Sequence, residues 1–256
     1  MSATVKLQAL CCGRLEFARQ GFFPDAAPEA RMTVPVSGFL IRHAQGTLLF
    51  DTGVACGAAA DPAGVLGKRI AAYFTMAGAA HENLLDQLAA QGVEPEAVTH
   101  VACSHLHFDH CGCNRNFPRA RILLQRAEMD AARAPNFTYD ARLWDLPLDY
   151  QLLDGEHDVF GDGSVLLRPT PGHTAGHQSA IVRTSAQRRF VLAADACYTE
   201  EHLHGDIVPA QRWHEGRMRE SMQWLRSQRA MAGTNVLFGH DAVQWVRVEA
   251  AKGVLS

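Results

Sequence analysis

The feature that most constrains this chain is a ten-residue segment, residues 104–113, in which metal-binding side chains are concentrated. Four of its side chains are imidazoles or carboxylates, the ordinary ligands of zinc and its first-row neighbours: His105, His107, Asp109 and His110. The segment follows an apolar run at residues 99–103 that predicts a buried strand. A polar loop with coincidental histidines is the simpler interpretation, but four residues of ligand type within six positions favour a metal site.

The spacing also suggests how this segment reaches its ions. Alternate residues of a chain leaving a strand point the same way, so His105 and His107 are predicted to reach one ion. Asp109 and His110 then need a tight turn to face a second ion nearby. Gly112 is expected to supply backbone freedom directly after them.

Composition and charge argue against several classes of protein. A chain of 256 residues that is 47% hydrophobic can bury a sizeable core. The formal net charge is −3 and the basic residues are scattered, whereas nucleic-acid-binding surfaces are normally basic. No apolar run approaches membrane-spanning length, and the first residues lack the pattern of a signal peptide. We therefore expect a cytoplasmic protein that binds neither nucleic acid nor membranes.

The seven cysteines form an odd set without the spacing of a disulfide framework, and most are predicted to be free, buried thiols. Cys111, Cys113 and Cys197 lie beside the candidate ligands in the sequence. Thiolate ligation is an alternative for them. The imidazoles and carboxylates already fill two coordination spheres, so we expect these cysteines to be neighbours of the site.

Hydrophobic patterns divide the chain into strands and helices with no linker or repeat. Strands are predicted at residues 5–10, 36–43, 47–50, 99–103, 121–125, 151–153, 165–168, 179–182, 190–193 and 236–238. Helices are predicted at residues 82–91, 127–133 and 214–228, an irregular segment at 134–147, and a mobile loop or short helix over a pocket at 54–80. This order favours one α/β domain over residues 1–256, with two β-sheets packed face to face and helices outside.

Three further residues of ligand type directly follow predicted strands or lie a few residues beyond them: His173, Asp195 and His240. Each alone is weak evidence, because histidine and aspartate are common at strand ends. Together with residues 104–113 they predict that loops from several strands converge at one rim of the sandwich.

These motifs, in this order, resemble the metallo-β-lactamase fold superfamily over nearly the whole chain. The resemblance rests on residues 105–112 and on further marks at Asp51-Thr52-Gly53, residues 170–177, Asp195 and Gly239-His240. Within the superfamily, the sequence is most similar to N-acyl-homoserine lactone lactonases, the quorum-quenching enzymes. Tyr198, three residues after Asp195, is a mark of those lactonases more than of the wider superfamily.

The resemblance implies an αβ/βα sandwich that holds two divalent metal ions, with zinc expected and iron, cobalt or manganese as alternatives. One ion would be held by three histidines: His105, His107 and His173. The other would be held by Asp109, His110 and His240. Asp195 would bridge the ions, and a hydroxide between them would attack the carbonyl of a lactone ring. Tyr198 would donate to the carbonyl oxygen, and Asp109 would pass a proton to the leaving oxygen.

Simpler roles than metal binding are expected for several other residues. Asp51 is expected to accept an N–H from a ligand histidine and not to bind metal itself. His177 is expected to be a hydrogen-bonded structural histidine. His202 and His204 have ligand-like spacing but are expected to lie in a solvated loop. Phe108 either lines an acyl pocket or wedges its loop in place, and both interpretations stay open.

Other functions on the same fold compete with the lactonase. A thioesterase of the glyoxalase II type would carry a C-terminal helical extension, and a nuclease would need a basic face or an inserted domain. A di-iron reductase would place glutamate at the position of His107. A metal-binding module without catalysis is the alternative from another class, and the complete ligand set argues against it. We therefore expect a hydrolase of carboxylic ester bonds acting on a small-molecule lactone, with a homodimer left open.

Overall fold

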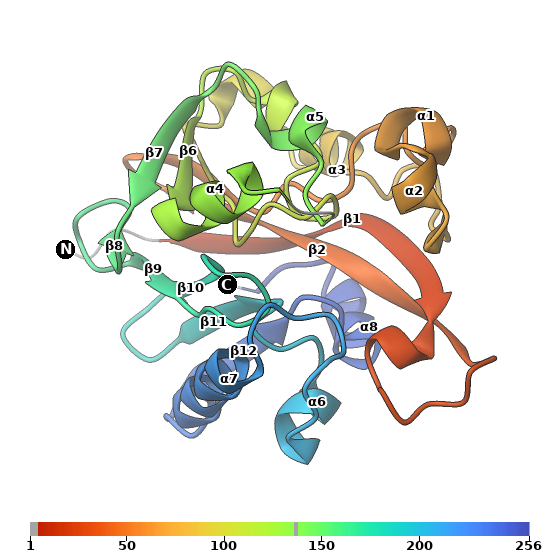
Figure 1. Ribbon diagram of the computed structural model, residues 1–256. Coiled ribbons are helices and arrows are strands. Elements are labelled where there is room, and N and C mark those ends of the chain that lie inside the picture. The colour runs from red at the N-terminus through yellow and green to blue at the C-terminus, as the bar shows by residue number, and fades with distance from the viewer. Residues whose placement is uncertain (1–4, 136–137, 256) are drawn as a thin grey trace.

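The computed structural model describes residues 5–135 and 138–255, so expectations for residues 1–4 and 136–137 lie outside it. Its strands form two sheets that pack face to face, with helices on the outer sides, as predicted (Figure 1). None of the described helices has the length and apolar character needed to cross a bilayer.

The first sheet has seven strands, which are β1 Lys6–Ala18, β2 Arg31–His43, β3 Gly46–Phe50, β4 Phe74–Met76, β5 His100–Ala102, β6 Arg121–Gln125 and β7 Asp149–Leu153. Their order is β4-β1-β2-β3-β5-β6-β7. The strands from β3 to β7 in this order run parallel, so they end at the same edge of the sheet. That edge places the residue after β3 beside the loop after β5.

The second sheet has five strands, which are β8 His157–Asp158, β9 Val165–Pro169, β10 Gln178–Arg183, β11 Arg189–Ala194 and β12 Thr234–Phe238. Their order is β12-β11-β10-β9-β8. Only β11 and β12 run parallel among these described strands, and both therefore end at the same edge. Asp195 and His240 follow these two strands, which brings them close together.

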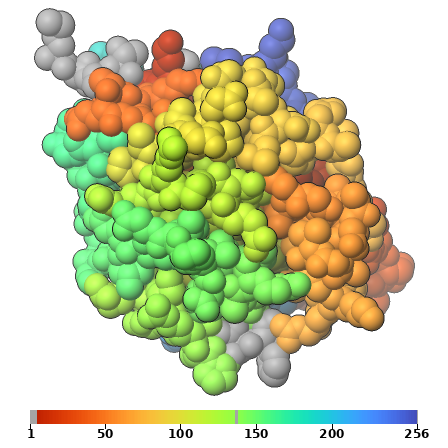
Figure 2. All heavy atoms as spheres, turned by 90° about the horizontal axis from the view of Figure 1, so that it is seen from above, coloured from red at the N-terminus to blue at the C-terminus, as the bar shows by residue number. Residues whose placement is uncertain are grey.

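The helices are α1 Pro62–Leu66, α2 Lys68–Ala71, α3 Leu84–Ala90, α4 Arg126–Arg133, α5 Ala141–Trp144, α6 Glu200–Gly205, α7 Glu215–Arg229 and α8 Ala242–Ala250. In Figure 1, α3, α4 and α5 lie on the outer side of the first sheet and α7 on the outer side of the second. Seen from the helical side of the first sheet, the orange segment with α1 and α2 lies beside the yellow and green layer (Figure 2).

Alternation along the strands creates separate apolar layers, because successive side chains of a strand point to opposite faces. In β3, Leu48 and Phe50 pack into the core between the sheets, whereas Leu49 faces the helices of the first sheet. In β11, Leu192 faces the core between the sheets and Val191 faces α7. The sandwich is therefore built from the period-two pattern that predicted its strands.

The structure decides one open expectation and adds elements that the sequence patterns missed. Residues 54–80 form the short helices α1 and α2, of which α2 lines a cavity, and this confirms the helical alternative. They also form the unpredicted short strand β4, which pairs with β1 at the edge of the first sheet. Helices α5, α6 and α8 were not predicted. The N-cap side chains of Thr199 and Asp241 accept backbone N–H groups of the first turns of α6 and α8, so capping residues were present as a signal.

Candidate metal centre

Loops at one edge of the sandwich bring all seven predicted ligand side chains together. They follow β5, β9, β11 and β12, and their exposed fractions lie between 0% and 9%. Two glycines allow this close packing. A Cβ on Gly112 would lie 2.2 Å from the Ala55 nitrogen, and one on Gly172 would lie 2.3 Å from the Met218 nitrogen. Gly112 is therefore required for space, and not for the backbone freedom expected of it, since its φ is not positive.

Three imidazoles converge on one side of the centre. The Nδ1 of His107 lies 3.0 Å from Nε2 of His105 and 2.9 Å from Nε2 of His173. Burial lowers the pKa of His107 and of His173 to about 3. Burial, with nearby His110, also takes the pKa of His105 well below its usual range. These rings are neutral, which is the form that coordinates a cation.

Two imidazoles and a carboxylate lie on the other side. The Nε2 atoms of His110 and His240 are each 3.7 Å from Oδ2 of Asp109. Burial alone would lower the pKa of His110, but the negative charges of Asp195 and Asp109 outweigh it and raise that pKa well above its ordinary value. The same balance raises the pKa of His240. The negative charge that favours protons here would also favour a metal cation.

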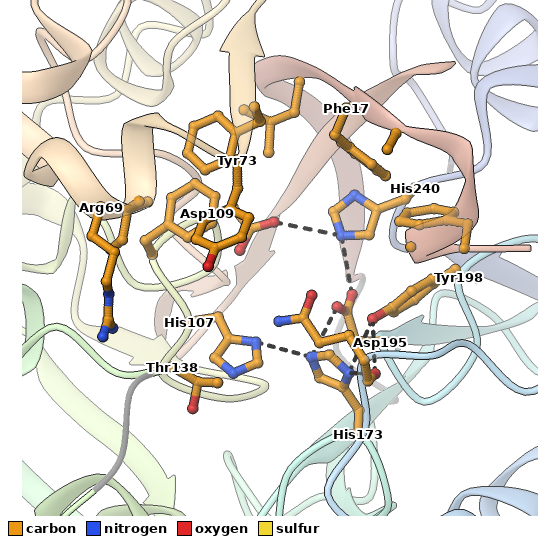
Figure 3. A pocket seen from close by; sticks show the side chains of 18 residues that line it. Phe17, Arg69, Tyr73, His107, Asp109, Thr138, His173, Asp195, Tyr198 and His240 are labelled. Carbon is orange, nitrogen blue, oxygen red and sulfur yellow. Dashed lines mark hydrogen bonds and ion pairs between the residues drawn. The ribbon is translucent and has the colours of Figure 1, made fainter. Parts of the chain in front are cut away.

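Asp195 lies between the two groups, as Figure 3 shows for His173 and His240. Its Oδ2 is 3.2 Å from Nε2 of His173, while its Oδ1 is 3.3 Å from Nε2 of His110 and 3.2 Å from Nε2 of His240. Burial would raise the pKa of Asp195, but these histidines hold it well below its usual range. Ala194 precedes it with φ of 44°, a conformation that residues with side chains rarely adopt.

The donor set fits two cations. Three groups of donor atoms each lie within 4.8 Å of one another: His105, His107 and His173; His105, His110 and Asp195; Asp109, His110 and His240. Among the described residues, the buried His110 Nε2 and Asp195 Oδ1 atoms lie 3.3 Å apart, but neither has a contact with the geometry of a hydrogen bond. Leaving buried polar atoms unpaired is costly. Coordination to metal would satisfy both atoms.

Hydrogen bonds to the opposite ring nitrogens orient these imidazoles. The Nδ1 of His110 lies 2.8 Å from Oδ2 of Asp51, whose carboxylate also accepts the N–H and O–H of Ser104. The expected contact between Asp51 and one of the candidate histidines is confirmed. The Nδ1 of His240 donates to the Pro35 carbonyl at 2.9 Å, and the Nδ1 of His173 to the Gln211 carbonyl at 3.2 Å. In the neutral rings, Nε2 is then the atom left to bind a cation.

Glu128 on α4 supports the site and was not singled out from the sequence. It is fully buried, and it accepts the Leu106 N–H on Oε1 and the Gly176 N–H on Oε2, both at 3.0 Å. It therefore ties the loop after β5 to the loop that contains His173. The available signal was an acidic residue beside the apolar Met129 in the predicted helix.

The other histidines have structural roles. The Nε2 of His177 accepts the Asp195 backbone N–H at 3.1 Å, and its Nδ1 lies 2.9 Å from Thr170 Oγ1, so the structural interpretation is confirmed. The expectation that His202 lies in a solvated loop is wrong. His202 is fully buried on α6, with Nε2 2.9 Å from the Phe22 carbonyl oxygen, whereas His204 is exposed.

The thiols of Cys111 and Cys197, beside the candidate ligands, form hydrogen bonds to backbone carbonyls outside the ligand cluster. The Sγ of Cys111 donates to the Leu106 carbonyl at 3.4 Å, and that of Cys197 to the Thr199 carbonyl at 3.3 Å. Burial raises the pKa of both thiols. No cysteine belongs to a cation-sized donor group among the described residues. All seven are free thiols, as expected.

A cavity of about 700 Å³ opens over the centre. One end is polar and is lined by His107, Asp109, His173, Asp195, Tyr198 and His240 (Figure 3). The other end is apolar and is lined chiefly by Leu15, Phe17, Phe22, Ile70, Phe74 and Phe108. Phe108 stacks on Phe74 with ring centroids 4.5 Å apart and an interplanar angle of 3°, so it both lines the cavity and packs against the 54–80 segment.

Tyr198 lies where the polar and apolar ends meet. Its Oη is 3.1 Å from Nδ1 of His173 and donates to the Gln211 carbonyl at a longer 3.4 Å. Its ring centroid is 4.3 Å from that of Phe22. Burial raises the pKa of the phenol well above its ordinary value, so Tyr198 is a proton donor to hydrogen bonds at neutral pH.

Comparisons with known proteins agree with this geometry. Residues 31–240 match the family model of the metallo-beta-lactamase superfamily. N-acyl homoserine lactonase AttM of Rhizobium johnstonii is 33% identical over 250 residues, which cover 94% of this chain and 95% of the relative. AiiA of Bacillus thuringiensis subsp. kurstaki is 28% identical over 240 residues, or 93% and 94% of the two chains. A solved N-acyl homoserine lactone hydrolase, with the product N-hexanoyl-L-homoserine at its catalytic metal centre, superposes with a TM-score of 0.86 at 27% sequence identity. The superposition covers 96% of this chain and 97% of the solved one.

Proposed function

Since this chain belongs to the metallo-beta-lactamase superfamily, we propose that it hydrolyses the lactone ring of N-acyl-homoserine lactones at a centre of two divalent metal ions. The observation that carries the proposal is the position of the ligand cluster at the polar end of a cavity whose other end is apolar. A homoserine lactone with an acyl chain has the same division into a polar ring and an apolar tail. The similarity to AttM and AiiA supports this substrate.

The buried side chains would hold the ions in two groups that share one carboxylate. His105, His107 and His173 would hold one ion, and Asp109, His110 and His240 the other. Asp195 would bind both, because its two oxygens face opposite groups. Zinc is the proposed metal, with iron, cobalt or manganese as alternatives, since imidazole and carboxylate suit all of them. When bound, the ions lower the pKa of water and stabilise negative charge on oxygen.

The chain's own residues orient the substrate and handle its protons. The Tyr198 hydroxyl would exchange its long hydrogen bond to the Gln211 carbonyl for one to the lactone carbonyl oxygen, which gains charge during the reaction. Asp109 lines the cavity, so its carboxylate could accept a proton from the attacking water and then give that proton to the oxygen released by ring opening. The stacked rings of Phe74 and Phe108 would pack along the acyl chain and exclude water.

We also propose that residues 1–256 form one domain in the cytoplasm. The core between the sheets contains residues from both, such as Phe50 and Leu192, which supports a single domain. Seven free thiols are typical of a reducing compartment. A homodimer stays a prediction that light scattering can test.

A pH-indicator assay on the metal-loaded protein tests the proposed substrate. Ring opening releases a proton, so a panel of short and long acyl-homoserine lactones should acidify the solution, and elemental analysis should find about two metals per chain, as in a two-metal site. Activity on other lactones or on thioesters alone would overturn the substrate and leave the fold intact. Protein stripped with a chelator and then reloaded is the control.

Tyr198→Phe tests the role of the hydroxyl, because phenylalanine keeps the ring that packs on Phe22. We expect unchanged metal content and a kcat lower by about 10²-fold, the usual effect of losing one donor to a developing oxyanion. An unchanged kcat would remove Tyr198 from the mechanism.

A further inference from the structure

Two thiols face each other directly behind the ligand loop. The Sγ atoms of Cys56 and Cys113 are 2.8 Å apart. Cys56 lies between β3 and α1, and Cys113 ends the segment that contains the candidate ligands. A disulfide bond is about 2.0 Å long, so the sulfurs need to approach by less than about 1 Å to be joined.

We propose that Cys56 and Cys113 form an oxidisable dithiol that a hydroperoxide converts into a disulfide and a thiol reductant restores. Among the described cysteines, this is the pair whose sulfurs are in contact; Cys103, Cys111 and Cys197, by contrast, contact Asn114 and backbone carbonyls. The proposal concerns a modification of the chain and does not depend on the lactone substrate.

The surroundings of the two sulfurs give them different roles. Cys56 is partly exposed, whereas Cys113 is fully buried and lies 3.2 Å from the Val54 carbonyl oxygen. The hydrogen bond between the thiols lowers the pKa of Cys56, and the same bond, with burial, raises that of Cys113. Cys56 is therefore the thiol that peroxide can reach and the one that more readily forms a thiolate, and Cys113 is the thiol that resolves the product.

The chemistry balances with one equivalent of hydrogen peroxide. The Cys56 thiolate attacks one peroxide oxygen, the O–O bond breaks, and the leaving hydroxide takes up a proton, which gives a Cys56 sulfenic acid and water. The Cys113 sulfur then attacks the Cys56 sulfur, the S–O bond breaks, and the departing hydroxide takes the Cys113 proton. Two thiols and one hydrogen peroxide become one disulfide and two waters.

The crosslink would join two segments that already support His110. The Thr52 N–H donates to the His110 carbonyl at 2.7 Å, and the Gly112 N–H donates to the Gly53 carbonyl at 2.9 Å. These bonds hold the two segments side by side, so the two sulfurs stay within reach of each other in the folded chain. Because a crosslink restricts the unfolded chain, the oxidised protein should have a higher midpoint of thermal unfolding.

Thiol counting after peroxide treatment and unfolding tests this proposal. The reduced chain should show all seven thiols, the oxidised chain should lose two of them, and dithiothreitol should restore both. Peptide mapping should find the Cys56 and Cys113 peptides joined. No thiol loss, a different pairing, or Cys56 oxidised to sulfinic acid without a crosslink would overturn the proposal.

Variants distinguish the two roles and control for the other cysteines. Cys56→Ser should lose no thiol to peroxide. Cys113→Ser should instead accumulate a Cys56 sulfenic acid that dimedone captures, because the resolving thiol is gone. Cys11→Ser, at a buried cysteine outside the pair, should still form the disulfide. Circular dichroism checks that each variant folds, and a Cys113→Ser chain without trapped sulfenic acid would contradict the assignment of Cys56.

Discussion

The two sides of the candidate metal centre are supported by different carboxylates. On the side of Asp109, Asp51 contacts the imidazole of His110 directly. On the side of His107, Glu128 accepts the backbone N–H groups of Leu106 and Gly176. Burial raises the pKa of both carboxyl groups. One carboxylate therefore sets the orientation of a ring, and the other sets the path of the loops that carry the rings.

The two sides also differ in charge before any metal binds. His107 and His173 have pKa values of about 3 because they are buried among other imidazoles. His110 and His240 have raised pKa values because Asp195 and Asp109 outweigh burial. The imidazoles of one side are therefore neutral and ready to coordinate a cation, whereas a cation on the other side meets stronger competition from protons.

Asp195→Ala should have the largest effect, because it removes the group common to both sides. We expect both metals to be lost and ring opening to fall to the level of the buffer. His107→Ala removes a ligand from one side only and should leave a larger metal content than Asp195→Ala, although activity is also lost. Elemental analysis of the two purified variants measures the difference. Equal metal contents would contradict the assignment of Asp195 to both sides.

Asp51→Asn should have the next largest effect and should be confined to the side of His110. The amide keeps the size of the carboxylate but loses its charge, and such supporting partners change metal affinity by about 10–100-fold. Isothermal titration of the metal-free chain should find one of its two affinities reduced by that factor. A parallel fall in both affinities would remove the distinction between the two carboxylates.

Glu128→Gln should affect folding more than coordination. Only one of the two backbone N–H donors keeps an acceptor, and a buried donor without a partner costs about 1–3 kcal/mol of unfolding free energy. Urea unfolding measures this loss. Metal affinity should change less than in Asp51→Asn. An intact stability with a large loss of affinity would show that Glu128 acts on the ligands and not on the loops.

The sequence predicted the candidate ligands because imidazoles and carboxylates recur after several predicted strands, in the order that the family resemblance implies. It did not reveal Glu128, since its partners include the backbone N–H groups of Leu106 and Gly176, which carry no residue-type signature. The 54–80 segment was unclear for a related reason: its strand β4 is only three residues long and exists through pairing with β1. Contacts between distant backbones are thus the part of the site that local patterns cannot predict.

Lowering the pH should distinguish the metal affinities of the two sides without any substitution. This is the smallest of the expected effects. Raised pKa values mean that His110 and His240 bind protons more tightly than ordinary imidazoles do in the metal-free chain, so proton competition at their side grows as the pH falls. His107 and His173, with pKa values of about 3, meet no such competition until the pH approaches that value.

Metal titrations at pH 7.5, 6.5 and 5.5 should therefore show one affinity falling steadily and the other nearly constant. Titration in buffers of different ionisation enthalpy should assign the proton release to the weakening site. In His107→Ala the remaining site should keep the steep pH dependence, because it is the side of His110 that survives. A surviving site that is insensitive to pH would contradict the inferred charge difference between the two sides. It would leave the different roles of Asp51 and Glu128 untouched.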